Sequence, residues 1–520
     1  MDEVLVMDYD VSEVVMHEEG SEGFANDELQ IDISREAAQD NYRKAGERVP
    51  CDVSKITWEK NSRIFNPSLK LLVDQVLSEL NYEHNLTEFQ EIFLHALGSK
   101  NDVFAVTSTG TGKSEVTGLA ALLLRKIFEE PKGLAVVFVP LSGILDEMVE
   151  NQKIPTAGVT NTMSGQIFGL DENGVGHSSV TEVDILAGKF ARIVMHPEAL
   201  KTPKIEKLML LLKQKQYILG AFVDEFHVMQ PQHWASFRPD MEEQTARLRV
   251  FLRKTAPTGA LSATATKADV DRAVDILGLK GHPIVLAQSP LQSQHKFVLL
   301  QRPSDNYGFE GFKDKNNKYH PGLLDQLRVI YIDEYVRSIL GGNEPKHAVI
   351  FFRTENQLIL LLNYLRQTLS ISNARSAPFV CLISSTPPVT ELIINKRKGS
   401  VSLYLTTQKM LLGVNVPRLD ICIFVKPMNT PHAILQGAGR TGRPISGEPG
   451  IRTRSVVYIL SNGGDVGLQV KGMSDEVRNL VSFKGGCLRD LLKESFLDSK
   501  SQVSKQDDWC CNFCSKSFKD

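Results

Sequence analysis

Two adjacent carboxylates, Asp224 and Glu225, directly follow an apolar run, and a tract containing His, Trp, Phe and Arg comes after them. An acidic pair in this position can hold Mg²⁺ and orient a water molecule for attack on a phosphoryl group. The same pair at a strand end is also a common helix cap. A phosphate-binding segment elsewhere in the chain therefore has to decide between the two interpretations.

Such a segment is STGTGKS at residues 108–114, which lies between an apolar run and a helical pattern. Two glycines allow a tight turn whose backbone N–H groups converge on phosphate oxygens, and the following helix directs its positive end at the same place. A Gly/Ser-rich turn that merely contains a lysine is disfavoured by the strand before it and the helix after it. Lys113 is expected to contact the β- and γ-phosphates of ATP, and the Ser114 hydroxyl is expected to bind Mg²⁺ together with Asp224. The expected phosphate cradle consists of Thr109, Gly110, Thr111, Gly112, Lys113 and Ser114.

Two arginines three residues apart, Arg440 and Arg443, occur in QGAGRTGRP at residues 436–444. This spacing puts both guanidinium groups on one side of a helical turn or bend. Planar guanidinium groups suit phosphate, and arginines supplied across a cleft stabilise the charge of phosphoryl transfer. Gly-Arg pairs also occur in flexible basic loops. The segment follows a region with no phosphate-binding loop of its own, which favours a role in completing the ATP site of the first region.

The cysteines are unevenly distributed, because four of the seven, Cys487, Cys510, Cys511 and Cys514, lie near the C-terminus. Four thiolates, two of them at C-x-x-C spacing, suit a tetrahedral structural Zn²⁺. A reduced cluster without metal is the alternative, and the adjacent Cys510–Cys511 pair leaves open whether both bind the ion.

Short β-branched runs alternate with helical periods from about residue 66, which indicates parallel sheets with crossover helices. The runs are too apolar for strands exposed on one face, so we expect helices on both sides of each sheet. Ligands in such sheets bind beyond the carboxyl ends of the strands. Strands are predicted at 103–107, 134–139, 191–195, 218–223 and 259–262, and in a second series at 347–352, 379–383, 401–407, 420–425 and 455–460.

The fold class is therefore α/β, with two tandem RecA-like domains and a small C-terminal zinc-binding helical subdomain. Predicted boundaries are 1–65 for an acidic, largely disordered arm, 66–288 for the ATP-binding domain, 289–462 for the second domain and 463–520 for the subdomain. The net charge of −3 means that any nucleic acid must be held by a local basic cleft. No run of eighteen apolar residues occurs, so no membrane span is expected.

In this order the motifs resemble superfamily 2 helicases, and within them the RecQ family of DNA helicases, from about residue 86 to residue 514. TSTGTGKS, DEFH, SATAT and QGAGRTGR resemble motifs I, II, III and VI, and VPLSGILDEMVENQ and TTQKMLLGVNVP resemble two further motifs of the family. The resemblance implies that Gln90 recognises adenine, although Thr87 stands where the family has Arg. It places Gly413 and Gln436 at the nucleotide as well. It implies a 3′-to-5′ motor acting on single-stranded DNA and duplex junctions in the nucleus, with ATP, Mg²⁺ and structural Zn²⁺. We also expect the chain to work as a monomer.

The resemblance also explains the tract after the acidic pair, since the family has an aromatic-rich loop there that senses single-stranded DNA. Aromatic faces stack on bases without regard to sequence. Phe237 could equally fill a core, whereas Trp234 sits among polar residues. The residues expected to contact DNA are Trp234, Phe237, Arg238, Pro140, Ser142 and Thr407.

Several features depart from the family. CLISSTPPVTELI replaces a segment that the family writes Y-H-A-G-L, FFRTENQ lacks the usual motif IV residues, and the chain stops directly after the cysteines, where many members continue into a winged-helix domain. Two other functions stay open on this basis. One is an RNA-dependent ATPase of the same superfamily, and the other is a DNA-bound scaffold that no longer hydrolyses ATP.

Overall fold

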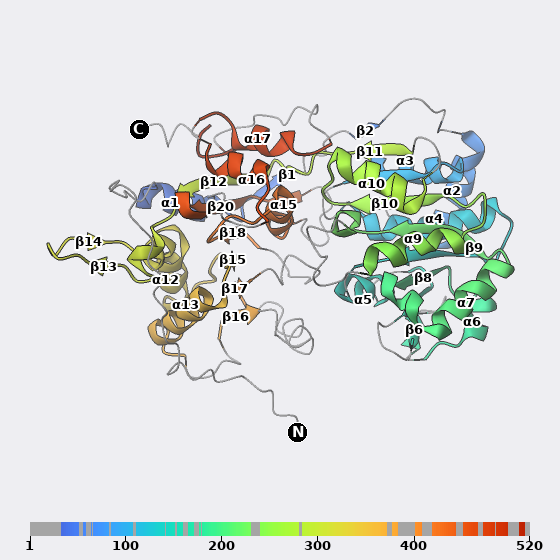
Figure 1. The fold of residues 1–520 in the computed structure, drawn as a ribbon, viewed down its shortest axis with the longest axis horizontal. Helices are drawn as coiled ribbons and strands as arrows, with labels where there is room; N and C mark the ends of the chain where they lie inside the picture. The colour runs from blue at the N-terminus through green and yellow to red at the C-terminus, as the bar shows by residue number, and fades with distance from the viewer. Residues whose placement is uncertain are drawn as a thin grey trace, which may run out of the picture.

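The structure is a computed structural model in which two α/β lobes lie side by side (Figure 1). It describes residues 33–50, 56–58, 64, 66–82, 85–107, 111–140, 142–150, 153–159, 165–170, 176–177, 179–229, 240–279, 283–371, 377–382, 401–407, 419–443, 451–465, 472–483, 485–497 and 509–514. Among these residues, no helix combines the length and the apolar character needed to cross a membrane.

The first lobe is built on a ten-stranded sheet whose central strands are all parallel. The edges are antiparallel, because β2 pairs with β11 on one side and β6 and β7 follow β5 on the other. In sheet order the strands are β2 (Thr57–Trp58), β11 (Ile284–Ala287), β3 (Val103–Val106), β10 (Thr258–Ser262), β9 (Ile218–Val223), β4 (Leu134–Phe138), β8 (Arg192–Met195), β5 (Thr156–Val159), β6 (Ile167–Leu170) and β7 (Gly176–His177).

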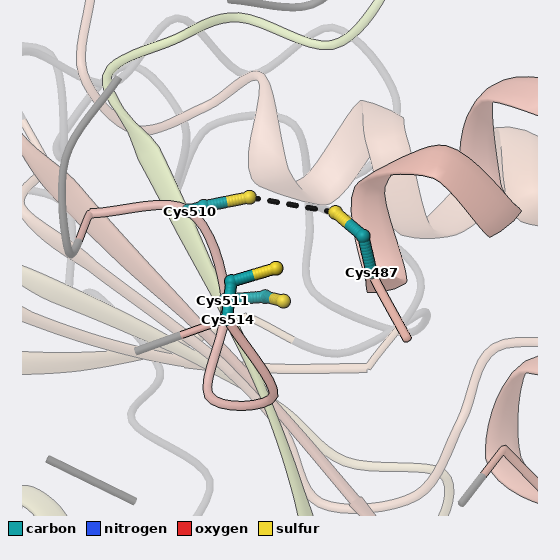
Figure 2. A group of neighbouring side chains, drawn as sticks. All are labelled: Cys487, Cys510, Cys511 and Cys514. Atoms are coloured by element: carbon teal, nitrogen blue, oxygen red, sulfur yellow. Dashed lines mark hydrogen bonds between the residues drawn. The ribbon is translucent and has the colours of Figure 1, made fainter. Parts of the chain in front are cut away.

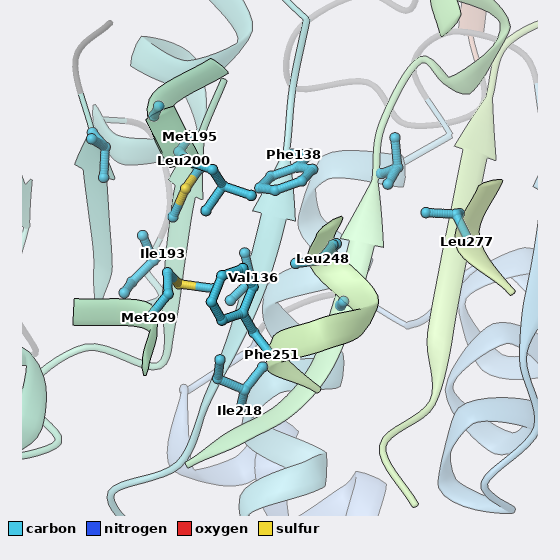
Figure 3. Packing of buried hydrophobic residues seen from close by; sticks show 14 of the residues in the cluster. Val136, Phe138, Ile193, Met195, Leu200, Met209, Ile218, Leu248, Phe251 and Leu277 are labelled. Carbon is cyan, nitrogen blue, oxygen red and sulfur yellow. The ribbon is translucent and has the colours of Figure 1, made fainter. Parts of the chain in front are cut away.

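Both faces of this sheet are buried, and this is why its strands read as unbroken apolar runs. Along β4, Val136 and Phe138 point into one hydrophobic cluster, whereas Val137 points into a second cluster on the other face. Figure 3 shows the first cluster, where Phe251 packs beside Val136. The helices of the lobe are α2 (Pro67–Glu79), α3 (Glu88–Gly98), α4 (Lys113–Ile127), α5 (Ser142–Glu150), α6 (Glu182–Leu186), α7 (Pro203–Gln214), α9 (Met241–Phe251) and α10 (Lys267–Leu277).

The second lobe has a six-stranded sheet that is parallel throughout. In sheet order its strands are β12 (His295–Gln301), β20 (Ser455–Ser461), β18 (Ile421–Phe424), β15 (Ala348–Phe351), β17 (Leu403–Thr406) and β16 (Phe379–Leu382). Its helices include α11 (Leu323–Leu327), α12 (Asp333–Leu340), α13 (Glu355–Thr368) and α15 (Pro431–Ala438), and a hairpin of β13 (Phe312–Lys313) and β14 (Tyr319–His320) projects from it (Figure 1). Two tandem parallel-sheet domains are thus confirmed, with a strand in each predicted run.

Part of the predicted acidic arm is folded, so the expectation of disorder is wrong for residues 33–50. Ser34 caps α1 (Arg35–Lys44), and β1 (Arg48–Pro50) pairs with β19 (Ile451–Thr453) of the second lobe. Asn41 is buried there, where it donates to Tyr458 Oη at 3.2 Å and accepts from Lys296 Nζ at 2.9 Å. The acidic composition of the whole arm conceals this short amphipathic helix, which is stabilised by a core far along the chain.

The C-terminal residues pack on the second lobe (Figure 1). Helices α16 (Asp475–Val481) and α17 (Leu488–Glu494) contribute Val477, Leu480, Leu488 and Leu492 to its core. The segment 509–514 runs beside β12, where Phe297 N–H donates to the Cys510 carbonyl at 3.1 Å and Asn512 N–H donates to the Phe297 carbonyl at 3.1 Å. Segment 509–514 is therefore hydrogen-bonded to β12, the edge strand of the second sheet.

Candidate ATP site and cysteine centre

The phosphate-binding turn lies where the sequence predicts it, between the end of β3 and the start of α4. Gly112 has a φ of +84°, a left-handed conformation that favours glycine. Lys113 is buried, and its ammonium donates to the Thr107 carbonyl at 2.8 Å. Burial lowers the pKa of Lys113, and the charges of Glu225 and Asp224 partly offset that effect. Thr111 lies within 2.6 Å of the Thr107 hydroxyl, whereas Thr109 and Gly110 fall outside the described residues.

Gln90 lies directly over this turn, because a Cβ added to Gly112 would come within 2.3 Å of Gln90 Nε2. The Gln90 side chain is held at both ends. Its Oε1 accepts from the Thr87 backbone N–H at 2.9 Å in a capping box at the start of α3, and its Nε2 donates to Glu115 at 3.1 Å. Thr87, which stands where the related family has Arg, thus serves as the helix cap that orients Gln90.

The acidic pair stands at the carboxyl end of β9, on the strand neighbouring β10 and β4. Asp224 is buried, and its Oδ1 accepts from the Glu225 N–H at 2.9 Å. Burial, followed by the charge of Glu225, raises the pKa of Asp224 to about 7. Burial would also raise the pKa of Glu225, but the charges of His227, Lys113 and Arg440 outweigh it and lower that pKa. Glu225 adopts a φ of +50°, a conformation that costs energy and is common at functional sites.

The arginines lie in the turn after α15, on the side of the second lobe that faces the acidic pair. Burial lowers the pKa of Arg440 to about 10, the charge of Arg443 adds to this, and the charges of Glu225 and Glu147 oppose it. Burial likewise lowers the pKa of Arg443, with Glu147 opposing. Glu147 belongs to α5 of the first lobe, and Glu225 follows β9. Both arginines therefore lie within electrostatic reach of the lobe that carries Lys113.

A histidine connects the two lobes at this point. His227, two residues after Glu225, is buried and lies 2.8 Å from the Ser262 hydroxyl at the end of β10. Its other ring nitrogen contacts the Gln436 amide of α15. Burial lowers the pKa of His227 to about 4, so the ring is neutral near pH 7. Gln436, predicted to bind nucleotide, contacts this histidine in the structure.

Sequence reasoning missed Arg192, which braces the phosphate-binding turn from behind. Its side chain is fully buried on β8 and donates to the Ser114 carbonyl, the Thr117 hydroxyl and the Met148 carbonyl, each at 2.9 Å. These bonds connect the first turn of α4 to α5. An arginine inside an otherwise apolar strand run is the one sequence signal that could have revealed this role, since a buried charge requires hydrogen-bond partners.

Three of the six residues expected to contact nucleic acid lie among the described residues. Trp234, Phe237 and Arg238 lie outside the described residues, as does Gly413 of the nucleotide set. Ser142 begins α5, and Pro140 is buried at the end of β4. Thr407 follows β17, and its N–H donates to the Leu382 carbonyl at 3.3 Å.

The four predicted cysteine ligands converge, as Figure 2 shows. All four Sγ atoms lie within 4.8 Å of one another, and the sulfurs of Cys487 and Cys510 are 3.5 Å apart. A tetrahedral ion with Zn–S bonds of about 2.3 Å needs sulfurs roughly 3.8 Å apart, so this set fits zinc. Hydrogen bonds from Cys487 and Cys510 lower the pKa of Cys511, whereas hydrogen bonds with Cys487 and Cys511 raise the pKa of Cys510, as expected where neighbouring thiols share one thiolate. Both members of the adjacent pair can reach one ion.

The two lobes, with the predicted phosphate-binding turn and acidic pair in one and the paired arginines in the other, have the layout of a helicase core. Comparison with known families agrees with this class. The DEAD/DEAH box helicase family matches residues 87–273, and the helicase conserved C-terminal domain matches residues 332–444. The chain belongs to the superfamily 2 helicases.

Individual relatives are distant. A Caenorhabditis elegans protein described as an ATP-dependent DNA helicase Q1 is 27% identical over 234 residues, covering 44% of this chain and 34% of its own length. A protein with the same description from Caenorhabditis briggsae is 22% identical over 488 residues, covering 90% of this chain and 68% of its own length. The chain thus matches only about a third of the first relative.

Two solved structures share the fold. The DUF1998 helicase MrfA bound to DNA superposes with a TM-score of 0.54 at 14% identity, covering 83% of this chain and 53% of that protein. The DEAD-box helicase Mss116 bound to ssRNA and UDP-BeF superposes with a TM-score of 0.52 at 14% identity, covering 84% of this chain and 82% of that protein. At this identity the likeness concerns the fold alone.

Proposed function

We propose that this protein is an ATP-dependent DNA helicase of the RecQ type that moves 3′ to 5′ on single-stranded DNA. The observation that carries the proposal is the contact of His227, just after the acidic pair, with Gln436 of α15, the helix that leads into Arg440 and Arg443. This is the arrangement expected where a nucleotide is cleaved between two lobes. Two relatives are described as DNA helicases, which favours DNA over RNA as the track.

Each residue of the site has a distinct task in this proposal. Bound Mg²⁺–ATP supplies the phosphoryl group and a divalent charge. Lys113 and the turn at Gly112 would hold the phosphates, Ser114 and Asp224 would hold Mg²⁺, and Glu225 would orient and deprotonate the attacking water. The two arginines stabilise the charge that develops on the transferred group.

Hydrolysis is coupled to movement through the lobe boundary. The lobes close when the arginines engage the phosphates and reopen when that charge is lost, so the affinity of each lobe for the strand alternates. Only a difference in strand affinity between the two states produces movement. The contacts of His227 with Ser262 and Gln436 provide a path by which closure acts on the acidic pair.

A strand-displacement assay tests the proposal on duplexes of DNA or RNA with a 3′ or a 5′ single-stranded tail, with and without ATP. We expect ATP-dependent displacement of the 3′-tailed DNA duplex, and none by Lys113→Ala or Glu225→Gln. The Glu225→Gln variant should still bind ATP. Displacement of RNA alone would favour an RNA-dependent ATPase, whereas nucleic-acid binding without any hydrolysis would favour a scaffold.

The cellular setting is part of the same proposal. Residence in the nucleus and action at duplex junctions follow from the resemblance to RecQ helicases, and a monomeric state is proposed with them. Imaging of a fluorescently tagged chain, binding to forked and linear duplexes, and light scattering of the purified protein test these three points separately.

A further inference from the structure

A second set of contacts crosses the lobe boundary beyond the motif residues. His432, on the first turn of α15, lies with its Nε2 3.4 Å from Asp269 Oδ2, on the first turn of α10 in the other lobe. Both side chains are buried, with 8% and 0% of their surfaces exposed. Asp269 also accepts from the Thr266 backbone N–H at 2.7 Å. Because the His432 and Asp269 side chains are buried against each other where the lobes meet, this contact favours the arrangement in which the lobes touch.

The His432 ring also stacks between the lobes. It lies parallel to the His227 ring, with centroids 5.9 Å apart and an interplanar angle of 19°. His432 thus contacts His227, two residues after Glu225, and it stands one helical turn before Gln436 on α15. A change at His432 is therefore transmitted to the acidic pair and to the arginine turn together.

Two residues that follow α17, Phe496 and Leu497, also pack at this contact between the lobes. Phe496, just after α17, packs edge-on against His432 at 5.2 Å between centroids and is buried in the second-lobe core. The next residue, Leu497, donates its N–H to the Ala265 carbonyl at 3.1 Å and packs against the core of the first lobe. Two consecutive residues are thus anchored in different lobes, and α17 begins beside Cys487.

We propose an inter-lobe latch that holds the ATP site closed. It is formed by the His432–Asp269 contact and by Phe496 and Leu497, which follow α17. His432 acts in it as a positioning residue and does not contact nucleotide. The inference rests on the proposed ATP-driven function. It adds that closure depends on Phe496 and Leu497 as well as on the arginines. These two residues therefore affect the fraction of molecules whose lobes are closed for hydrolysis.

Two substitutions at one position separate the contributions. His432→Gln keeps a donor for Asp269 but removes the ring, whereas His432→Phe keeps a ring but removes the donor. We expect His432→Phe to lower kcat of DNA-stimulated ATP hydrolysis about tenfold with little change in KM for ATP, because the closed fraction falls while the open site still binds nucleotide. His432→Gln should retain kcat within about threefold. Asp275→Asn, an exposed position on α10, is the matched control.

A double-mutant cycle distinguishes a latch from a local folding defect. In an Asp269→Asn background, His432→Phe should have little further effect on kcat. The Phe496→Ala/Leu497→Ala variant tests the C-terminal part and should also lower kcat several-fold. Equal effects of His432→Phe in both backgrounds, or wild-type kcat in either variant, would overturn the latch.

Small-angle X-ray scattering with a nonhydrolysable ATP analogue gives a readout that needs no turnover. Wild type and Asp275→Asn should become more compact with the analogue, whereas His432→Phe and Phe496→Ala/Leu497→Ala should remain expanded. Equal compaction of all four proteins would refute the latch. A wild type that compacts but never hydrolyses ATP would instead refute the proposed function, so the two failures are distinguishable.

Discussion

Replacing Gly112 by alanine tests the geometry of the phosphate-binding turn at a single atom. The added methyl group would lie 2.3 Å from Gln90 Nε2, at a backbone position with a φ of +84°. The left-handed conformation costs about 1–2 kcal/mol for a residue with a Cβ. Pushing the Gln90 amide aside disrupts its bonds to Thr87 and Glu115, at about 1 kcal/mol each.

The free energy of unfolding should accordingly fall by about 3–4 kcal/mol. Urea denaturation followed by circular dichroism measures it, with Gly463→Ala as the control, because a Cβ there meets nothing within 4 Å. Gln90→Ala removes the obstructing amide, so Gly112→Ala should cost only the conformational part, about 1–2 kcal/mol, in that background. ATP binding by the single variant should weaken strongly, since the turn and Gln90 shift together.

Two results would contradict this reasoning. A Gly112→Ala protein as stable as wild type would mean that the turn does not hold the left-handed conformation. An equal cost with and without Gln90 would mean that the Gln90 side chain does not lie over the turn.

Three further predictions concern other parts of the molecule. Chelation of metal or Cys511→Ser should lower the melting temperature and reduce bound zinc from one ion per chain to none, as measured by elemental analysis, whereas Cys422→Ser should leave the zinc content unchanged. Burial lowers the pKa of His295 to about 3, so this ring stays neutral in the folded chain while it gains a proton in the unfolded chain below about pH 6.5. The unfolded state then binds more protons than the folded state. The free energy of unfolding should therefore fall by about 1.4 kcal/mol per pH unit from about pH 6 toward pH 4. In urea titrations at several pH values, His295→Gln should remove this part of the pH dependence. Asn41→Leu removes the acceptor of the buried Lys296 ammonium and should cost about 2–3 kcal/mol in the same assay, and an unchanged stability would show that α1 is not part of the core.

The order of chemistry along the chain could be predicted from the sequence because the relevant signals are local. An apolar run such as 218–223 is a strand covered on both faces whatever surrounds it, and the residue after it, Asp224, must lie at a carboxyl edge. Gly112 has the left-handed conformation that glycine favours, and this preference depends only on the local backbone. Cysteine spacing near the C-terminus likewise predicted a cluster, which the structure brings within reach of one ion.

What only the tertiary structure decided are contacts between residues far apart in sequence. The packing of α1 on the second lobe depends on Lys296 and Tyr458, each of which lies more than 250 residues from Asn41 in the sequence. The bracing of the phosphate turn by Arg192 and the His432–Asp269 pair depend on how separate helices and strands meet. Periodicity fixes which face of an element is apolar, but not which distant polar group meets its buried donors and acceptors. Those pairings form only in the folded chain, because a buried polar group needs a hydrogen-bond partner and that partner comes from a distant part of the sequence.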